Sequence, residues 1–147
     1  MGTATGAAGL ARDEKVRPAS KGRLWTGRVM SGLVVLFLIP DAIIKFTKPA
    51  PVVEAFNHLG WPLSLANALG VLLLAVTIVY AIPRTAVLGA ILLTGYLGGA
   101  IATHVRVGDP LFTHVLFPSY LGAVLWGGLY LRDNRLTALI PLRKKED

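Results

Sequence analysis

The chain has 147 residues, enough for one domain, of which 54% are hydrophobic and only 16% are charged; soluble domains average about 25% charged residues. A formal net charge of +7 occurs together with a mean hydropathy of +0.61. This combination excludes a soluble nucleic-acid-binding protein and indicates an integral membrane protein with basic ends. The sequence contains no cysteine, which excludes disulfide scaffolds, thiolate zinc sites, c-type haem attachment and Cys-ligated iron–sulfur clusters.

The first segment, residues 1–23, mixes charges with Gly, Ala and Ser and shows no hydrophobic periodicity. We therefore expect a disordered N-terminal tail. A cleaved signal peptide is the alternative interpretation of the apolar segment that follows. No A-x-A-like cleavage site follows that segment, where Asp41, Lys45 and Lys48 come next, so the sequence favours a membrane span.

Four apolar segments of about 20 residues follow, each long enough to cross a hydrocarbon core about 30 Å thick. They cover residues 24–44, 63–82, 86–105 and 111–131, and together form a predicted membrane domain, 24–131. Inside a bilayer the backbone must satisfy its own hydrogen bonds, so each span should be a helix. The sequence predicts an all-α polytopic membrane protein with four transmembrane helices in an antiparallel bundle.

The orientation of the bundle follows from the distribution of Lys and Arg. Four spans place twelve of these residues on the side of both termini, including a basic tail at 132–147, and three on the other side. Trp25, Tyr80 and Tyr130 fall at the boundary on the basic side. We therefore predict a multi-pass protein of the inner or plasma membrane with both termini in the cytoplasm.

The third span carries a stripe of small residues at i, i+3, i+4 and i+7, namely Gly95, Gly98, Gly99 and Ala102. Small side chains allow another helix to approach closely, which is a main source of packing energy in lipid. We expect this face to be a helix-packing surface without chemistry of its own.

Polar residues gather in the half of the spans away from the basic ends. An acid–base pair one turn apart follows Pro40, the third span ends in a polar stripe, and Glu54 and Asp109 lie in the loops of that side. Such groups are costly near lipid and often functional, so we expect them to surround one polar vestibule. The candidate ligand-binding residues are Asp41, Lys45, Tyr96, His104, Arg106 and His114.

Each of these residues also has a plain structural interpretation. The acid–base pair is then an interfacial helix pair, the loop charges are solvated, and the two histidines are hydrogen-bonded interface residues. The histidines and carboxylates lack HxxxH or ExxH spacing, so we expect no metal site. We also assign no catalytic residue.

Several motifs resemble the DoxX-like family of small bacterial membrane proteins. They are PRTAVLGA from Pro83, LLTGYLGGA from Leu92, THVR from Thr103, WGGLYLRD from Trp126 and IPLR from Ile140. Asp41 with Lys45 resembles the acid–base signature at the end of that family's first helix. The resemblance extends over residues 24–143.

The resemblance implies a four-helix membrane protein linked to redox chemistry, because the family is named for subunits of a terminal oxidase and relatives belong to a thiosulfate:quinone oxidoreductase. It implies an accessory or binding subunit, beside a membrane oxidoreductase or as a homo-oligomer, with a quinone or an oxyanion in the vestibule. The chain has no haem, flavin or iron–sulfur motif, so we expect no catalysis by the chain alone.

Two other functions fit the same segments. One is a structural or assembly protein that binds no ligand and acts through its small-residue faces. The other is a small transporter, which the sequence favours less. Ion-coupled transport needs a carboxylate deep in a span, and none lies between Trp25 and Pro40 or in the other three spans.

Overall fold

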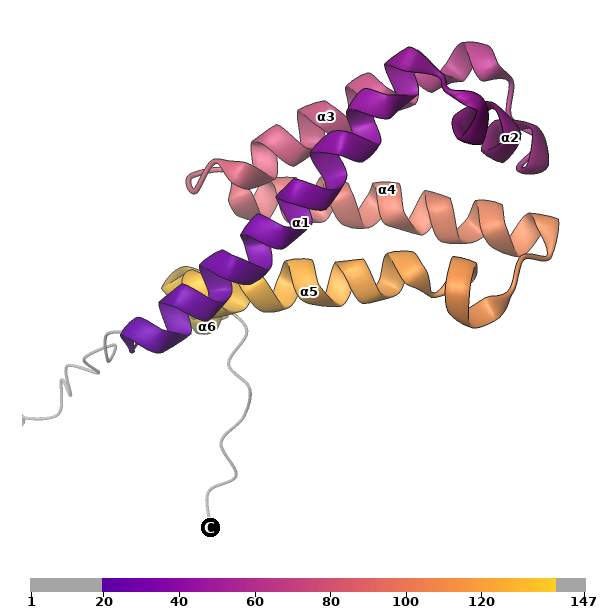
Figure 1. The fold of residues 1–147 in the computed structure, drawn as a ribbon. Coiled ribbons are helices and arrows are strands. Elements are labelled where there is room, and N and C mark those ends of the chain that lie inside the picture. The colour runs from indigo at the N-terminus through magenta and orange to yellow at the C-terminus, as the bar shows by residue number, and fades with distance from the viewer. Residues whose placement is uncertain (1–19, 140–147) are drawn as a thin grey trace, which may run out of the picture.

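Four helices long and apolar enough to cross a membrane dominate residues 20–139, the part of the chain that the computed structural model describes (Figure 1). In chain order the elements are α1 (Lys21–Thr47), α2 (Ala50–His58), η1 (Leu63–Leu65), α3 (Ala66–Ala81), α4 (Ala86–Val107), η2 (Leu111–Val115), α5 (Phe117–Arg132) and α6 (Asn134–Leu139). The described residues contain no strand, so the predicted all-α membrane fold is confirmed. Residues 1–19 and 140–147 of the two expected tails lie outside the described part.

The boundaries of α1 differ from the predicted first span at both ends. The helix begins at Lys21, where the side chain of Ser20 accepts a hydrogen bond from the backbone N–H of Arg23 at 3.3 Å. This is an N-cap, which satisfies one of the free donors of the first turn. The helix then continues through Pro40 to Thr47.

The fourth span consists of two helical pieces. A π-helical turn, Leu111–Val115, precedes α5, and α5 starts with Pro118 in its first turn. Proline lacks an N–H and clashes with the carbonyl four residues earlier, so it is accommodated best where a helix begins. Pro118 therefore restarts the helix inside the span.

The core lies where α1, α3, α4 and α5 meet, with Tyr80 fully buried at its centre. The Tyr80 hydroxyl donates to the carbonyl oxygen of Leu125 and shares a hydrogen bond with the Ser31 hydroxyl, both at 3.0 Å. Tyr80 lies near the end of α3 on the basic side, as the sequence predicts, and the structure adds that its side chain is buried inside the bundle. Its ring joins three helices because its hydroxyl finds partners inside the bundle, as a buried tyrosine requires.

Helices approach each other most closely at glycines outside the predicted stripe. A Cβ on Gly27 of α1 would lie 2.8 Å from the backbone of α5, and one on Gly70 of α3 would lie 3.0 Å from the carbonyl of Ala42. A Cβ on Gly89 would lie only 2.3 Å from the backbone N of Tyr80, and one on Gly128 would lie 2.8 Å from the Ser31 hydroxyl. These contacts explain why the bundle needs glycine at positions on all four long helices.

The predicted packing stripe does not pack against another helix of the described chain. A Cβ at Gly95, Gly98 or Gly99 would meet nothing within 4 Å, and Ala102 is exposed. Small-residue spacing identifies a smooth face, but the bundle closes on the opposite side of α4, through Gly89, Ala90 and Leu93. Gly95 and Gly99 instead line a cavity next to α3, and Ala102 is exposed.

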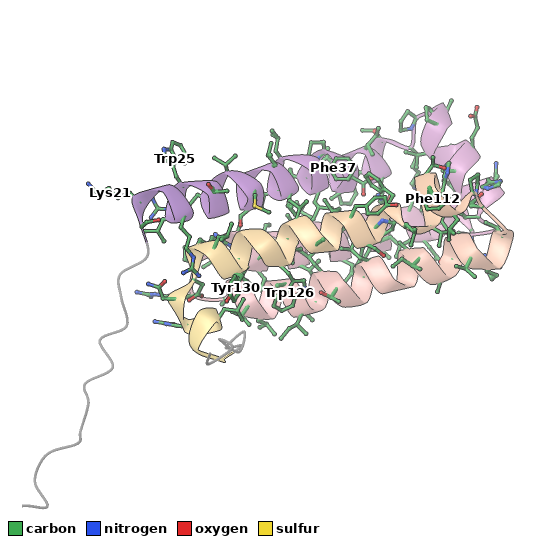
Figure 2. All side chains as sticks on the ribbon, turned by 90° about the horizontal axis from the view of Figure 1, so that it is seen from below. Lys21, Trp25, Phe37, Phe112, Trp126 and Tyr130 are labelled. Atoms are coloured by element: carbon green, nitrogen blue, oxygen red, sulfur yellow. The ribbon has the colours of Figure 1, made fainter. Side chains whose placement is uncertain are left out.

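The outward faces of the long helices are apolar, as a protein in a bilayer requires. In each span only 22–33% of the most hydrophobic window is buried within the chain, and residues such as Leu36, Val71 and Ile91 are about half exposed or more. Figure 2 shows side chains projecting outward along the whole length of the helices. The protein is therefore a multi-pass membrane protein.

The two ends of the bundle differ in character. At one end, here the basic end, α1 starts, α3 and α4 turn and α5 finishes, bringing together Arg28, Arg84, Arg132 and Arg135. At the other end α2 lies across the bundle near the loop between α4 and η2 (Figure 1). The candidate site lies at this second end.

Candidate functional site

A cavity of about 450 Å³ lies between α1, α2, α4 and α5, and is here called the vestibule. Its walls are mostly apolar, with Phe37 and Leu38 from α1, Phe56 from α2 and Leu97 from α4. Ligand pockets are typically of this size and composition, with a few polar groups that fix orientation. Asp41, Lys45, Tyr96 and His104 supply those groups in the vestibule.

Asp41 and Lys45 form an ion pair on the vestibule wall. The ammonium of Lys45 lies 2.7 Å from Oδ2 of Asp41 and donates to the Asp41 backbone carbonyl at 2.9 Å. One helical turn separates the two residues, so α1 presents them on the same face. The Lys45 side chain is only 13% exposed, and lysine is rarely this buried without a partner. The pair therefore places a fixed donor and acceptor beside an apolar cavity.

His104 is oriented by a carboxylate immediately beyond α4. Gly108 takes a left-handed conformation, φ 75°, which ends the helix, and the backbone N–H of Asp109 bonds back to the His104 carbonyl at 3.1 Å. This turn places Oδ2 of Asp109 2.6 Å from Nδ1 of His104. An ionised carboxylate only accepts, so Nδ1 of His104 carries the proton in this hydrogen bond.

Asp109 also binds His58, at the end of α2. Nε2 of His58 lies 2.6 Å from Oδ1 of Asp109, whose side chain is only 7% exposed. Hydrogen bonds from His104 and then His58 hold the pKa of Asp109 below its usual value. Arg106 makes a second link, because its guanidinium donates to the backbone carbonyl of Leu59. These two links, here the α2 latch, hold α2 against the end of α4.

The six predicted site residues do not form one polar cluster, and the vestibule is more apolar than expected. Asp41, Lys45, Tyr96 and His104 line it, whereas Arg106 and His114 do not. Two residues along a helix turn about 200° around its axis, so Arg106 faces away from His104 and reaches α2 instead. His114 is exposed, and its ring centroid lies 5.8 Å from that of His104.

Sequence reasoning missed the helix α2 and the part that His58 takes in the α2 latch. Phe56 is buried and lines the vestibule together with Val52, Ala55 and Leu59. The pattern was visible in the sequence, because Pro49 and Pro51 are typical of a helix start and Val52 and Phe56 lie four residues apart. A second cavity of about 330 Å³ shares Lys45, Phe56, Tyr96 and His104 with the vestibule, so these residues form a common wall.

Within residues 20–139, no group of three or more His, Asp or Glu side chains is arranged to hold a metal ion. The nearest arrangement, two histidines on Asp109, is explained by the α2 latch.

Comparison with known proteins gives a match to the DoxX-like family over residues 29–128. This range runs from α1 into α5 and includes every polar residue of the vestibule and the α2 latch. No curated protein and no solved structure matches the chain.

Proposed function

We propose, from the premise that the chain belongs to the DoxX-like family, that it is an accessory or binding subunit of a membrane redox system and holds a quinone in the vestibule. The observation that carries this proposal is the vestibule itself, an apolar cavity of about 450 Å³ with four polar residues on its wall. An apolar lining suits the ring and tail of a quinone better than a free oxyanion, which needs charged partners on several sides.

The polar groups match both redox forms of such a ligand. The Tyr96 hydroxyl and the Lys45 ammonium are donors for the carbonyl oxygens of a quinone. The Asp41 carboxylate is an acceptor for a hydroxyl of the reduced form, and Nε2 of His104 is a further polar atom that such a ligand would meet. These residues would bind and orient the ligand, and a partner protein would carry the electrons to or from it.

Binding of a short-chain benzoquinone or naphthoquinone to the purified full-length protein tests the proposal. We expect Asp41→Asn and His104→Ala each to weaken binding by about tenfold, the effect of losing one hydrogen bond to a charged or buried partner. Mass spectrometry of lipid-soluble molecules extracted with the wild-type protein from native membranes should show a quinone.

Glu54→Gln is the matched control for Asp41→Asn, because Glu54 is exposed on α2 and does not line the vestibule. This variant should bind the quinone as the wild type does. Wild-type affinity in both vestibule variants, at normal protein yield, would contradict the proposed site.

A structural or assembly function is the second candidate, and the open face of Gly95, Gly98 and Gly99 favours it. A smooth helix face without a partner in its own chain suits contact with another membrane helix. The extraction experiment separates the two functions: an associated membrane protein without any bound quinone would favour assembly.

The same proposal includes location in the plasma or inner membrane with the basic end in the cytoplasm. The excess of Lys and Arg at that end supports this orientation. The vestibule would then open toward the outer side.

A further inference from the structure

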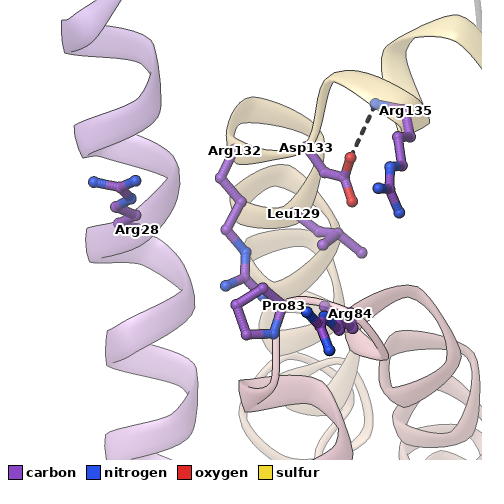
Figure 3. Close-up of a pocket in the computed structure, with 8 residues that line it drawn as sticks. Arg28, Pro83, Arg84, Leu129, Arg132, Asp133 and Arg135 are labelled. Carbon is purple, nitrogen blue, oxygen red and sulfur yellow. Dashed lines mark hydrogen bonds between the residues drawn. The ribbon is translucent and has the colours of Figure 1, made fainter.

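A third cavity, also of about 330 Å³, lies at the basic end, at the opposite end of the helices from the vestibule. Figure 3 shows Arg28 on α1 facing a group formed by Arg84 from the turn between α3 and α4, Arg132 at the end of α5 and Arg135 on α6. Pro83, Ala86 and Leu129 supply its apolar wall. Four arginines from separate parts of the fold therefore meet around one space.

Arg132 is the most firmly held of the four. Its Nη2 donates to the Tyr80 backbone carbonyl at 3.3 Å, and its guanidinium lies 5.2 Å from the centre of the Tyr80 ring. Its Nε is buried and has no hydrogen-bond partner among the described residues. A buried donor on a charged group is costly when it is unsatisfied, so Arg132, which lines the cavity, keeps hydrogen-bonding capacity that the described residues do not use.

The positive charge of this cavity has little compensation within its own lining. Among residues 20–139, Asp133 is the single acidic residue that lines it, and its Oδ1 accepts from the backbone N–H of Arg135 at 2.9 Å. Four guanidinium groups beside one carboxylate leave a net positive field. The guanidinium group of arginine donates two parallel hydrogen bonds, a geometry that matches two oxygens of a phosphate group.

The level of this cavity relative to the membrane surface indicates which phosphate-containing molecule could reach it. Trp25, which is 69% exposed, and Tyr130 lie at this end of the helices (Figure 2), and such aromatic residues mark the level of the lipid headgroups. We propose that the Arg28–Arg84–Arg132–Arg135 cavity is a binding site for the phosphate of an anionic phospholipid. This inference is independent of the function proposed for the vestibule.

Native mass spectrometry of the full-length protein, with phosphatidylglycerol or phosphatidylcholine added to the detergent, tests the proposal. We expect phosphatidylglycerol to bind in preference to phosphatidylcholine, and Arg84→Gln to reduce that binding by about tenfold, the loss of one charge-assisted contact. Lys21→Gln removes the same charge from an exposed residue of the same end that does not line the cavity. It should change binding by less than about twofold.

Three further results complete the test. Arg84→Lys keeps the positive charge but loses the paired hydrogen-bond donors of the guanidinium group. Reduced binding by this variant therefore supports a site with defined hydrogen-bond geometry rather than non-specific electrostatic attraction. Binding of inorganic phosphate that is lost in Arg84→Gln, without a preference for phosphatidylglycerol, would support the phosphate site but overturn its lipid source. Equal losses in Arg84→Gln and Lys21→Gln, or no binding of either probe, would overturn the site.

Discussion

Asp109 joins two histidines that belong to different helices, and this contact is one of the two links that hold α2 against the end of α4. Its side chain is 7% exposed and accepts one hydrogen bond from each ring at 2.6 Å. Replacing the carboxylate by an amide keeps the shape but removes the charge. We therefore expect Asp109→Asn to loosen α2 without disturbing the core around Tyr80.

The pH dependence of this effect follows from the direction of the pKa shift. The pKa of Asp109 is lower in the folded protein than its usual 3.8, mainly because of His104 and then His58. A carboxylate whose pKa is lowered by folding stabilises the folded protein at any pH above its usual pKa. That stabilisation is lost as the pH falls through the lowered pKa of the folded protein. In the detergent-solubilised protein, the midpoint of thermal unfolding of the wild type should be higher than that of Asp109→Asn near pH 6. The difference between the two midpoints should shrink below pH 4.

Asn57→Ser serves as the control for this comparison, because Asn57 is an exposed neighbour of His58 that takes no part in the α2 latch. It should unfold like the wild type at every pH. A difference between wild type and Asp109→Asn that stays constant from pH 7 to pH 3 would mean that the Asp109 carboxylate does not couple protonation to folding.

Sequence reasoning placed Asp41, Lys45, Tyr96 and His104 at one end of the molecule but did not find the contact between His58 and Asp109. The spacing of four between Asp41 and Lys45 defines their contact within one helix. The contact between His58 and Asp109 spans 51 positions and depends on the fold of α2. Long-range pairs of this kind carry no periodic pattern in the sequence.

At the scale of elements, some glycines allow two helices to pack closely, whereas others have space for a side chain. Gly27 and Gly32 lie on the same helix, α1, five residues apart. A Cβ on Gly27 would lie 2.8 Å from the backbone N of Arg132 and from the carbonyl oxygen of Gly128, whereas one on Gly32 would meet nothing within 4 Å. The two positions therefore form a matched pair.

We expect Gly27→Ala to destabilise the protein by about 1–3 kcal/mol, because α1 and α5 must move apart to admit the methyl group. Gly32→Ala should leave stability unchanged or raise it slightly, since alanine favours the helix over glycine by roughly 1 kcal/mol. The midpoint of thermal unfolding in detergent measures both. Similar midpoints for the two variants would show that α1 and α5 are not in close contact at Gly27.

The four spans could be predicted because about 20 apolar residues in a row leave a chain few alternatives in a bilayer. The short helix α2 escaped prediction because its nine residues lie between charged positions in what looked like a loop. The small-residue stripe on α4 was assigned to packing because spacing reveals a smooth face, but not which neighbour occupies it. Only the fold shows that α4 meets α3 and α5 through its other side.

At the scale of the whole molecule, the uneven distribution of charge follows the same axis as the line from the arginine cavity to the vestibule. Twelve of the 15 Lys and Arg residues belong to segments at the basic end. The arginine cavity lies there, and the apolar vestibule lies at the opposite end under α2. If positive charge is retained in the cytoplasm, the arginine cavity meets the inner leaflet and the vestibule meets the outer one.

The natural absence of cysteine allows this orientation to be tested residue by residue. Asn134 at the basic end and Asn57 on α2 are both exposed, so Asn134→Cys and Asn57→Cys each introduce a single accessible thiol. With a membrane-impermeant maleimide, Asn57→Cys should be labelled in intact cells and Asn134→Cys only after permeabilisation, while the cysteine-free parent gives no signal. The opposite pattern would invert the bundle, and the vestibule would then have to exchange its ligand with the cytoplasmic side.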